Sequence, residues 1–440
     1  MPGTTPRPWR RFRRGGGPGH ATPVPEATCR RRPGARPARP PDTDGDVAPY
    51  RAAGRAGGRW RPARTRHSAR TVSARDERPS SPRRRRRSIA SLGGHERRTA
   101  GQPAAPVSPT QRLLDPDQVR RYVAASLGPA VRVTGCGPLS GGGFAAVWWV
   151  RLDDGRAVVL KVGPPPSVPL LRYERDLIAA EARYLRLVAA HAPAVPVPPL
   201  LHHGSDPTLG DWLLTGHLPG RMLYTLVADG VPVDEVWTGL GTAFAALHRV
   251  TGDRYGYDGG RAAGPTWRSA YTAMVDDLLA DAADWAVPLP LPADRLRALV
   301  ARHAGVLDVV RRPALLHFDG WAGNVLAVPD PDGGHRLGGL VDGERFLYGD
   351  PLLDLVSPLL FRRAEDTPDD PFLRGYRTAG ARVALAEPGV RRRLGLYRLY
   401  LYLLMTVEAP SREITVDTEP DRFRILARLL DEELSALDGP

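Results

Sequence analysis

The sequence predicts an α+β protein with a small strand-rich first lobe and a larger helical second lobe. Three observations lead to this prediction. Residues 1–110 lack the apolar residues that a core requires. Residues 111–215 contain several short apolar runs typical of strands, and residues 216–440 contain longer stretches with helical spacing. A group of strands followed by a group of helices indicates α+β architecture.

Residues 1–110 are rich in Arg, Pro, Gly and Ala, and we expect them to be disordered. They contain 26 Arg and 7 acidic residues, a balance of +19; because the whole chain carries +14, residues 111–440 carry −5. No aromatic residues interleave the run Arg83–Arg87, so we do not expect a nucleic-acid partner. The tail is either a solvated extension or sequence upstream of the true start; we favour the second.

The remaining composition excludes several classes of protein. No run of about 18 uncharged apolar residues exists, which argues against a membrane-spanning helix. Arg10-Arg11 is not followed by the apolar stretch of a secretion signal. Cys29 and Cys136 are the two cysteines, too few in the globular part for a disulfide framework or a cysteine zinc site. We therefore expect a cytoplasmic location; the sequence does not indicate an oligomeric state.

Five strands are predicted in the first lobe, residues 111–215. A leading helix is expected at Pro116–Leu127, and Asp153-Asp154-Gly155 is a hairpin turn between the second and third strands. A helix is predicted at Leu171–Ala190, where apolar residues recur on one face. The predicted strands are Val131–Val133, Ala145–Leu152, Ala157–Val162, Leu200–His203 and Trp212–Thr215.

The second lobe, residues 216–440, starts with a predicted hinge at Gly216–Gly220 and is mainly helical. Its short apolar segments suit strands rather than helices because loops bound them closely. The predicted helical stretches are Val233–Val250, Thr266–Ala283, Pro292–Arg311 and a final block, Leu352–Leu437. The predicted strands are Leu315–Leu316, Val325–Ala327 and Leu340–Val341.

The segment from His317 to Asn324 has the pattern H-x-D-x-x-x-x-N and lies between two apolar strands. Polar groups held between buried strands must be satisfied or used. Asp319 can orient an attacking hydroxyl and accept its proton. Asn324 can return to the same cleft across a loop and offer its carbonyl oxygen to Mg²⁺. The pattern therefore predicts phosphoryl-transfer chemistry centred on Asp319.

Asp342 directly follows another apolar strand, 18 residues after Asn324, and is a second predicted magnesium ligand. Two further aspartates have structural interpretations. Asp350 is expected to cap a helix that begins at Pro351. Asp354 is expected to brace the candidate catalytic loop, residues 317–324.

The first lobe offers a candidate phosphate site. The segment Ser140-Gly141-Gly142-Gly143 lies between two predicted strands, and its glycines let backbone amides approach a phosphate. Lys161, the one lysine in a chain with 61 arginines, ends the next hairpin and can neutralise phosphates. The following helix supplies a carboxylate for this lysine; we favour Glu181, with Glu174 as the alternative.

This order of motifs resembles the aminoglycoside phosphotransferase family of the protein-kinase-like superfamily, from about Val131 to Leu437. The resemblance implies a kinase-like fold that uses ATP and Mg²⁺ to phosphorylate a hydroxyl group. Asp319 would be the catalytic base, with Asn324 and Asp342 as magnesium ligands. Lys161, paired with Glu181, would contact phosphates. The adenine would bind the backbone from Thr215 to Leu218.

The chain departs from the kinase pattern at three places. Ser140, Gly142 and Ala145 stand where the motif G-x-G-x-x-G has glycines, so this loop is expected to close less tightly. Phe318 follows His317, where protein kinases have an arginine, and no activation-loop region follows Asp342. Phe318 and the absence of an activation-loop region favour a small-molecule kinase over a protein kinase.

The acceptor is less well defined by the sequence. Several carboxylates could attract a cationic substrate. The four aspartates on or next to the predicted helix Thr266–Ala283 also fit an ordinary solvated helix face. An aminoglycoside or a related amino-sugar is the favoured acceptor. The alternatives are choline-, homoserine- or macrolide-like acceptors, or a nucleotide-binding regulator without turnover. The candidate carboxylates are Asp276, Asp277, Asp281, Asp284, Glu344 and Glu408.

We expect Lys161→Arg to be poorly active, because a broad guanidinium fork does not replace a compact ammonium at a point contact with phosphate. The measurement is ATP turnover by the purified variant. Unchanged turnover would remove the argument from the rarity of lysine in this chain.

Overall fold

The computed structural model describes residues 108–139 and 142–439. The disorder predicted for residues 1–107 and the phosphate contacts predicted for Ser140 and Gly141 lie outside the described residues. The tail was predicted to end at residue 110, and the structure differs from this prediction. Thr110 is fully buried and donates a hydrogen bond from Oγ1 to the carbonyl of Gly143, at 3.0 Å. The ordered chain therefore includes residues 108–110, which we had assigned to the tail.

The first lobe contains one antiparallel sheet of five strands in the order β1-β2-β3-β5-β4. The first strand begins and ends later than predicted. It contains Gly135 and Gly137, and a Cβ atom at Gly137 would stand 2.7 Å from the indole nitrogen of Trp149 on the paired strand. These glycines leave room for the tryptophan ring instead of ending the strand. The strands are β1 (Val133–Pro138), β2 (Ala146–Leu152), β3 (Ala157–Val162), β4 (Leu200–Asp206) and β5 (Gly210–Gly216).

Helix α2 (Pro116–Leu127) covers one face of this sheet. Asp115 caps it by accepting a hydrogen bond from the backbone of Gln118, whose side chain accepts one from Asp115 in return. Val119 and Val123 of α2 are fully buried in a cluster with the inward-facing residues of β2 and β3. This cluster is the core of the first lobe.

Helix α3 (Leu177–His191) covers the other face and is shorter than the predicted helix at Leu171–Ala190. The preceding residues form a separate 3₁₀ turn, η2 (Arg172–Glu174), followed by Asp176 with a φ of +58°. Both ends of the turn are tied to the second lobe: Arg172 pairs with Asp281 at 2.6 Å and Glu174 with Arg412 at 2.5 Å. These contacts hold the backbone away from a continuous helix.

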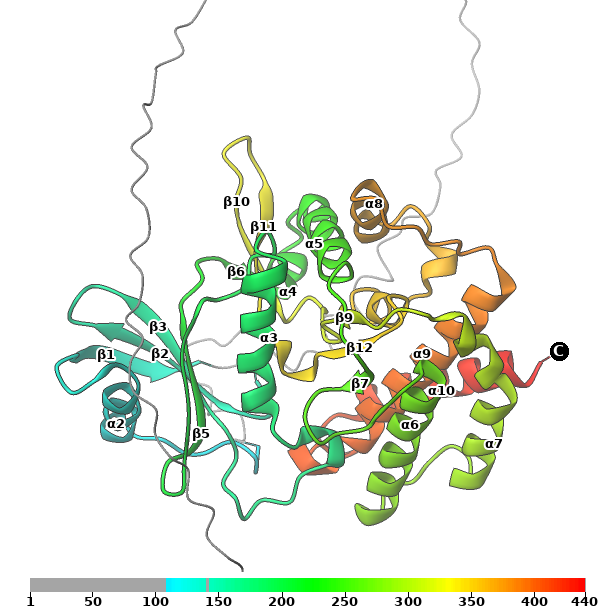
Figure 1. Cartoon of the computed structure of the whole chain (residues 1–440), viewed down its shortest axis with the longest axis horizontal. Coiled ribbons are helices and arrows are strands. Elements are labelled where there is room, and N and C mark those ends of the chain that lie inside the picture. Colours follow the sequence, from blue (N-terminus) through cyan, green and yellow to red (C-terminus); the bar gives the residue numbers. More distant parts are fainter. Residues whose placement is uncertain (1–107, 140–141, 440) are drawn as a thin grey trace, which may run out of the picture. The chain divides into compact units, whose positions relative to one another are not determined.

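Helix α3 also belongs to the core of the second lobe. Its buried residues, including Tyr184 and Val188, lie in one cluster with those of the C-terminal helices. Figure 1 shows α3 standing between the five-stranded sheet and the helices of the second lobe. A residue on α3 is therefore fixed relative to both lobes.

The connection between the lobes passes through the predicted hinge. Strand β5 ends at Gly216, where we propose that the second lobe begins, and β6 (Arg221–Met222) pairs with β10 (Val325–Pro329). Gly220 has a φ of +135°, and a Cβ atom there would lie 2.9 Å from the carbonyl oxygen of Ala327. This position therefore requires glycine.

The short strands of the second lobe form two small sheets. One has the order β11-β10-β6, with β11 at His335–Leu340. The other has the order β8-β7-β12-β9. Its strands are β7 (Tyr255–Tyr257), β8 (Ala263–Gly264), β9 (Ala314–Leu316) and β12 (Leu347–Gly349).

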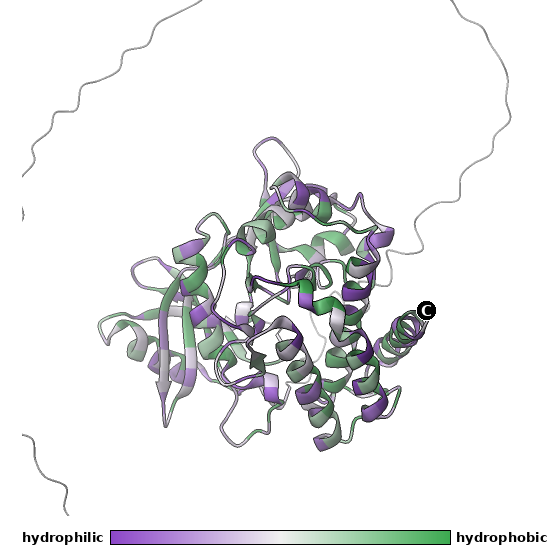
Figure 2. Ribbon diagram, turned by 45° about the vertical axis from the view of Figure 1, so that its right-hand side comes forward, coloured by the Kyte–Doolittle hydropathy of each residue, from purple (hydrophilic) through white to green (hydrophobic). Residues whose placement is uncertain are grey.

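The rest of the second lobe is helical, as predicted, although some boundaries differ. Helix α7 ends early and is followed by a 3₁₀ segment, η3 (Ala304–Val309). In Figure 2 these helices carry both hydrophilic and hydrophobic stretches, as expected where one face is buried. The helices are α4 (Leu223–Ala228), α5 (Asp234–Leu247), α6 (Trp267–Asp284), α7 (Ala293–His303), α8 (Pro371–Thr378), α9 (Pro388–Val407) and α10 (Pro420–Asp438).

The predicted helical block Leu352–Leu437 is not continuous, and the helix expected from Pro351 does not form. A 3₁₀ turn, η5 (Leu353–Leu355), takes its place. Asp350 accepts a hydrogen bond from the amide of Leu352, but its other oxygen binds Arg393 and Tyr397 of α9. It joins this turn to α9, so the predicted helix cap is wrong in detail. The described helices include none long and apolar enough to cross a bilayer.

Helix α9 contains a buried arginine where its sequence is most apolar. Arg398 is 4% exposed and pairs with Glu365 and Glu433, each at 2.8 Å. The three side chains connect α9 to η6 (Ala364–Asp366) and to α10. The two carboxylates compensate the guanidinium charge inside the protein.

We expect Arg398→Met to lower the free energy of unfolding by about 3–5 kcal/mol, because Glu365 loses its arginine and Glu433 keeps only its pair with Arg363. Arg428→Met is the matched control: it removes an exposed ion pair with Glu432 within α10 and should cost less than about 0.5 kcal/mol. Urea denaturation measures both values. Equal effects would show that the buried network is not important for stability.

Candidate active site

The candidate catalytic loop, residues 317–324, connects β9 to β10. Asp354 accepts hydrogen bonds from the amides of His317, at 2.8 Å, and Phe318, at 2.6 Å. The prediction that Asp354 braces this loop is confirmed. Phe318 adopts a φ of +65°, which is unfavourable for a bulky residue. Its ring is buried against Tyr257 and Tyr400, so tertiary packing holds this conformation.

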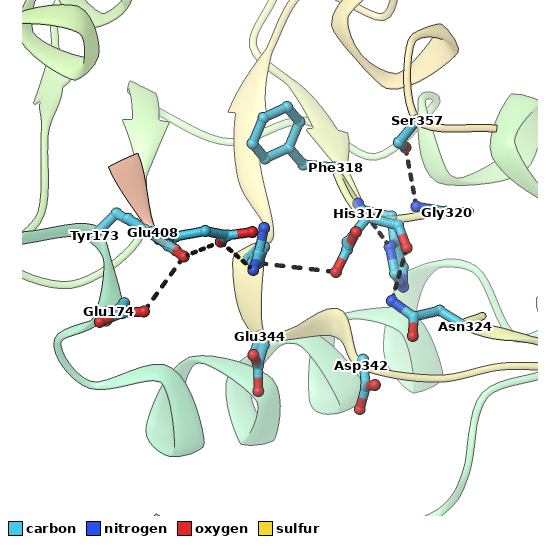
Figure 3. A network of polar contacts seen from close by, with 12 residues as sticks. Tyr173, Glu174, His317, Phe318, Gly320, Asn324, Asp342, Glu344, Ser357 and Glu408 are labelled. Carbon is cyan, nitrogen blue, oxygen red and sulfur yellow. Dashed lines mark hydrogen bonds and ion pairs between the residues drawn. The ribbon is translucent and has the colours of Figure 1, made fainter. Parts of the chain in front are cut away.

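A second layer of side chains supports the loop, and the sequence interpretation missed it. His248, directly after α5, lies 3.0 Å from Asp354 and 2.7 Å from the hydroxyl of Tyr376. Ser357 accepts a hydrogen bond from the amide of Gly320, at 3.0 Å (Figure 3). These residues belong to no local pattern. Only their convergence from three distant segments reveals the role.

Asn324 and Asp342 lie on paired segments. The amide of Val341 donates to the carbonyl of Asn324 at 3.0 Å, so these two residues lie opposite each other. Asp342 is the next residue after Val341. The side chain of Asn324 donates from Nδ2 to the carbonyl of Asp319, at 2.9 Å. This bond leaves the carbonyl oxygen Oδ1, the atom that suits Mg²⁺, for another partner. Figure 3 shows Asn324 and Asp342 on these neighbouring segments.

Lys161 of β3 contacts both lobes. Its ammonium lies 2.7 and 2.9 Å from the two carboxylate oxygens of Glu181 and also contacts Asp342. Glu174, the alternative partner, binds Arg412 instead. Burial alone would lower the pKa of Lys161, but Asp342 and Glu181 raise it above the ordinary value. Lys161 therefore stays charged, and it holds the pKa of Asp342 below its ordinary value although burial opposes this.

Asp319 occupies a different electrostatic environment from Asp342. Burial raises the pKa of Asp319 to about 6. Arg345 opposes this rise, because its Nε atom lies 3.8 Å from the Oδ2 atom of Asp319. Arg345 is held in place by Glu408, at 3.0 Å, and by the ring of Tyr173, 5.3 Å from the guanidinium carbon. A carboxylate with a pKa near 6 suits a general base at neutral pH. Arg345 was not identified from the sequence.

The residues expected to bind adenine lie at the end of β5 and just beyond it. Thr215 is buried and pairs with Val159 in the sheet. The amide of His217 donates to the carbonyl of Ala157 at 3.1 Å, which continues the pairing into the connection. The side chain of Leu218 lies against Gly339 of β11. This segment therefore runs along the junction of the two lobes, as an adenine site there requires.

The carboxylates expected to attract a cationic substrate are mostly paired with arginines. On α6, Asp276 binds Arg297 at 2.9 Å, and Arg172 binds Asp281 and Asp284. Burial raises the pKa of Asp277, the fourth member of this set. These ion pairs weaken the case for α6 as a cation-binding face.

The two other candidate carboxylates, Glu344 and Glu408, differ in protonation state. Burial raises the pKa of Glu344 to about 8, so it is protonated at neutral pH. Glu408 is buried, but Arg345, Arg412 and Arg422 hold its pKa at about 2. Its charge is therefore already neutralised by arginines, and neither residue offers a free negative charge to a substrate.

The model of the phosphotransferase enzyme family matches residues 136–387. This match covers more than half of the 440 residues, and the chain therefore belongs to that family. Membership confirms the resemblance inferred from the order of the motifs. The protein is a small-molecule kinase with the two-lobed α+β fold that the sequence predicted. No curated protein matched the sequence.

Several solved structures are similar to this chain. A protein described as a fructosamine-3-kinase from Thermobifida fusca YX-ER1 is 24% identical, with a TM-score of 0.47, over 70% of this chain and 98% of its own. A mutant aminoglycoside phosphotransferase APH(4)-Ia, in complex with AMP-PNP and hygromycin B, is 20% identical, with a TM-score of 0.46, over 73% and 99%. Macrolide 2'-phosphotransferase type I is 17% identical, with a TM-score of 0.47, over 71% and 98%.

We expect phosphoryl transfer to depend on the charge of Asp319. A base with a pKa of about 6 is protonated below that pH, so kcat/KM should fall about tenfold per pH unit there. Arg345→Met removes a nearby positive charge and should move this limb to higher pH. Arg268→Met, which removes an exposed pair with Asp308, should leave it in place. A pH profile of kcat/KM for all three proteins distinguishes these outcomes.

Proposed function

We propose that this kinase transfers the γ-phosphoryl group of ATP, bound with Mg²⁺, to a hydroxyl group of a small molecule. The observation that carries the proposal is the convergence of Asp319, Asn324, Asp342 and Lys161 on one site. These residues come from both lobes, and each has the chemistry that one part of the reaction needs.

The residues present fit a magnesium ion that is shared with phosphates. Among the described residues, no group of three or more His, Cys, Asp or Glu side chains could hold a metal alone. Asn324 and Asp342 supply one amide oxygen and one ionised carboxylate, and nucleotide oxygens would complete the shell. Bound there, Mg²⁺ would neutralise charge on the phosphates.

The chain's own residues account for the remaining steps. Lys161, oriented by Glu181, would place its ammonium against the α- and β-phosphates. Asp319 would orient the acceptor hydroxyl and take its proton as the oxygen attacks the γ-phosphorus and ADP leaves. The backbone from Thr215 to Leu218 would hold the adenine. Positioning and charge neutralisation supply most of the rate acceleration in such a site.

We propose several classes of acceptor, because the site residues define the reaction more closely than the substrate. An aminoglycoside or a related amino-sugar stays the first candidate, with choline-, homoserine- and macrolide-like compounds as alternatives. The pairing of Asp276, Asp281 and Asp284 with arginines weakens the reason for a polycationic acceptor. The test must therefore include neutral and acidic hydroxyl compounds.

The experiment is a screen of ATP consumption by the full chain over these acceptor classes, with Asp319→Ala as its control. Consumption that depends on one acceptor supports the proposal, and mass spectrometry of the product identifies the phosphorylated hydroxyl. A truncation starting at Gln111 is unsuitable because it removes the buried Thr110. Nucleotide binding without turnover of any acceptor would favour the alternative of a regulator.

We expect Asp319→Ala to reduce kcat by at least about 100-fold, because general-base catalysis contributes that much or more. Asp342→Ala should also abolish turnover, by loss of the metal. The two variants should differ in one respect: only Asp342→Ala should weaken the dependence of nucleotide binding on Mg²⁺. Near-normal kcat for Asp319→Ala in a folded protein would refute its assigned role.

A further inference from the structure

A short segment upstream of the family match lies against residues 142–145 of the first lobe, which we call the glycine segment. We call residues Ser108–Gln111 the strap. Thr110 donates from Oγ1 to the carbonyl of Gly143 at 3.0 Å. Gln111 donates from Nε2 to the carbonyls of Gly142, at 2.7 Å, and Ala145, at 3.2 Å. The strap therefore binds three carbonyl groups within four consecutive residues.

The strap is itself held in a fixed turn. The amide of Gln111 donates to the carbonyl of Ser108 at 2.8 Å, and the side-chain oxygen of Gln111 accepts from the amide of Ser108 at 3.3 Å. The hydroxyls of Ser108 and Thr110 are 3.0 Å apart. Because both ends of the Gln111 amide group are used, its Nε2 atom faces the glycine segment in a defined orientation.

These hydrogen bonds determine the direction of the neighbouring amides. In a planar trans peptide the C=O and the following N–H point in opposite directions. The carbonyls of Gly142 and Gly143 face the strap, so the N–H groups of Gly143 and Phe144 point away from it. Within residues 108–139 and 142–439, neither N–H donates a hydrogen bond to the protein. Successive backbone N–H groups of this kind can bind an anion.

The second lobe supports the same segment from another direction. Arg412 of η7 (Pro410–Arg412) approaches Gly143 so closely that a Cβ atom there would lie 3.5 Å from its Cδ and Nε atoms. Its guanidinium carbon lies 5.4 Å from the centre of the Phe144 ring, and Glu174 fixes its other end at 2.5 Å. The segment is therefore held between the strap and a buried arginine.

We propose that Thr110 and Gln111 are positioning residues for the nucleotide, which keep the amides of Gly143 and Phe144 directed at its phosphates. This inference rests on the proposed function. It also explains how the chain manages without the glycines of G-x-G-x-x-G. The segment need not fold tightly on itself, because hydrogen bonds from outside it determine its peptide orientation.

The test compares the binding of two ligands to the full chain by calorimetry. One is the Mg²⁺ complex of AMP-PNP, an ATP analogue that is not hydrolysed; the other is adenosine, which has no phosphates. The variants are Thr110→Val, Gln111→Leu and the double variant. Thr134→Val is the matched control, because Thr134 also donates from its hydroxyl to a first-lobe carbonyl, that of Arg151 at 3.2 Å.

We expect each single variant to weaken AMP-PNP binding about threefold and the double variant about tenfold, since each loses one or two hydrogen bonds. Adenosine binding should stay within about twofold, and the control should match the wild type. Gln111→Leu keeps Thr110 in place, so it tests the idea even if Thr110→Val is unstable.

Two other outcomes would overturn the inference while leaving the proposed function intact. One is an equal loss for AMP-PNP and adenosine, which would mean that the strap only supports the lobe as a whole. The other is unchanged AMP-PNP binding in the folded double variant. Failure of the wild type to bind AMP-PNP would instead contradict the proposed function, and this inference with it.

Discussion

The contact between Lys161, Glu181 and Asp342 is the interaction on which the rest of the site depends. Lys161 lies on the sheet of the first lobe, Glu181 on α3, and Asp342 just after β11 of the second lobe. Glu181 and Lys161 are largely buried, and Asp342 is one third exposed. A buried charge without a partner would be very unfavourable. The geometry is stable because each charge meets an opposite one at hydrogen-bond distance. The group therefore links the two lobes directly.

Backbone strain marks the two positions where chemistry is expected. Phe318, next to Asp319, and Asp342 itself both have φ values near +60°. Non-glycine residues adopt such values at a cost of order 1–3 kcal/mol, and only where the surroundings enforce them. Asp354 binds the loop amides on one side, and Lys161 binds the Asp342 carboxylate on the other. The supporting side chains thus hold the reactive ones in place.

Arginines have a large part in the electrostatics of this protein. They pair with Asp276, Asp281 and Asp284 of α6, they keep the buried Glu408 ionised, and Arg345 lowers the pKa of Asp319 against the effect of burial. Most of the carboxylates considered for a cationic substrate are therefore already paired with arginines. The counter-charges come from distant parts of the chain, so a local reading of α6 could not find them.

The sequence by itself determined the fold class, most of the larger elements and the position of the candidate catalytic loop between two strands. It could do so because strands and helices have different hydrophobic periods, and because H-x-D-x-x-x-x-N between apolar strands is a local pattern. The prediction that Asp354 braces the loop also held, since it follows from proximity to a recognisable motif.

The tertiary structure decided what depends on contacts between distant segments. It separated η2 from α3, because Arg172 and Glu174 bind residues more than 100 positions away. It selected Glu181 over Glu174, revealed Arg345 beside Asp319, and moved Thr110 from the tail into the domain. The physical reason is the same in each case: hydrogen bonds and ion pairs depend on distance in space, and periodicity along the chain carries no information about it.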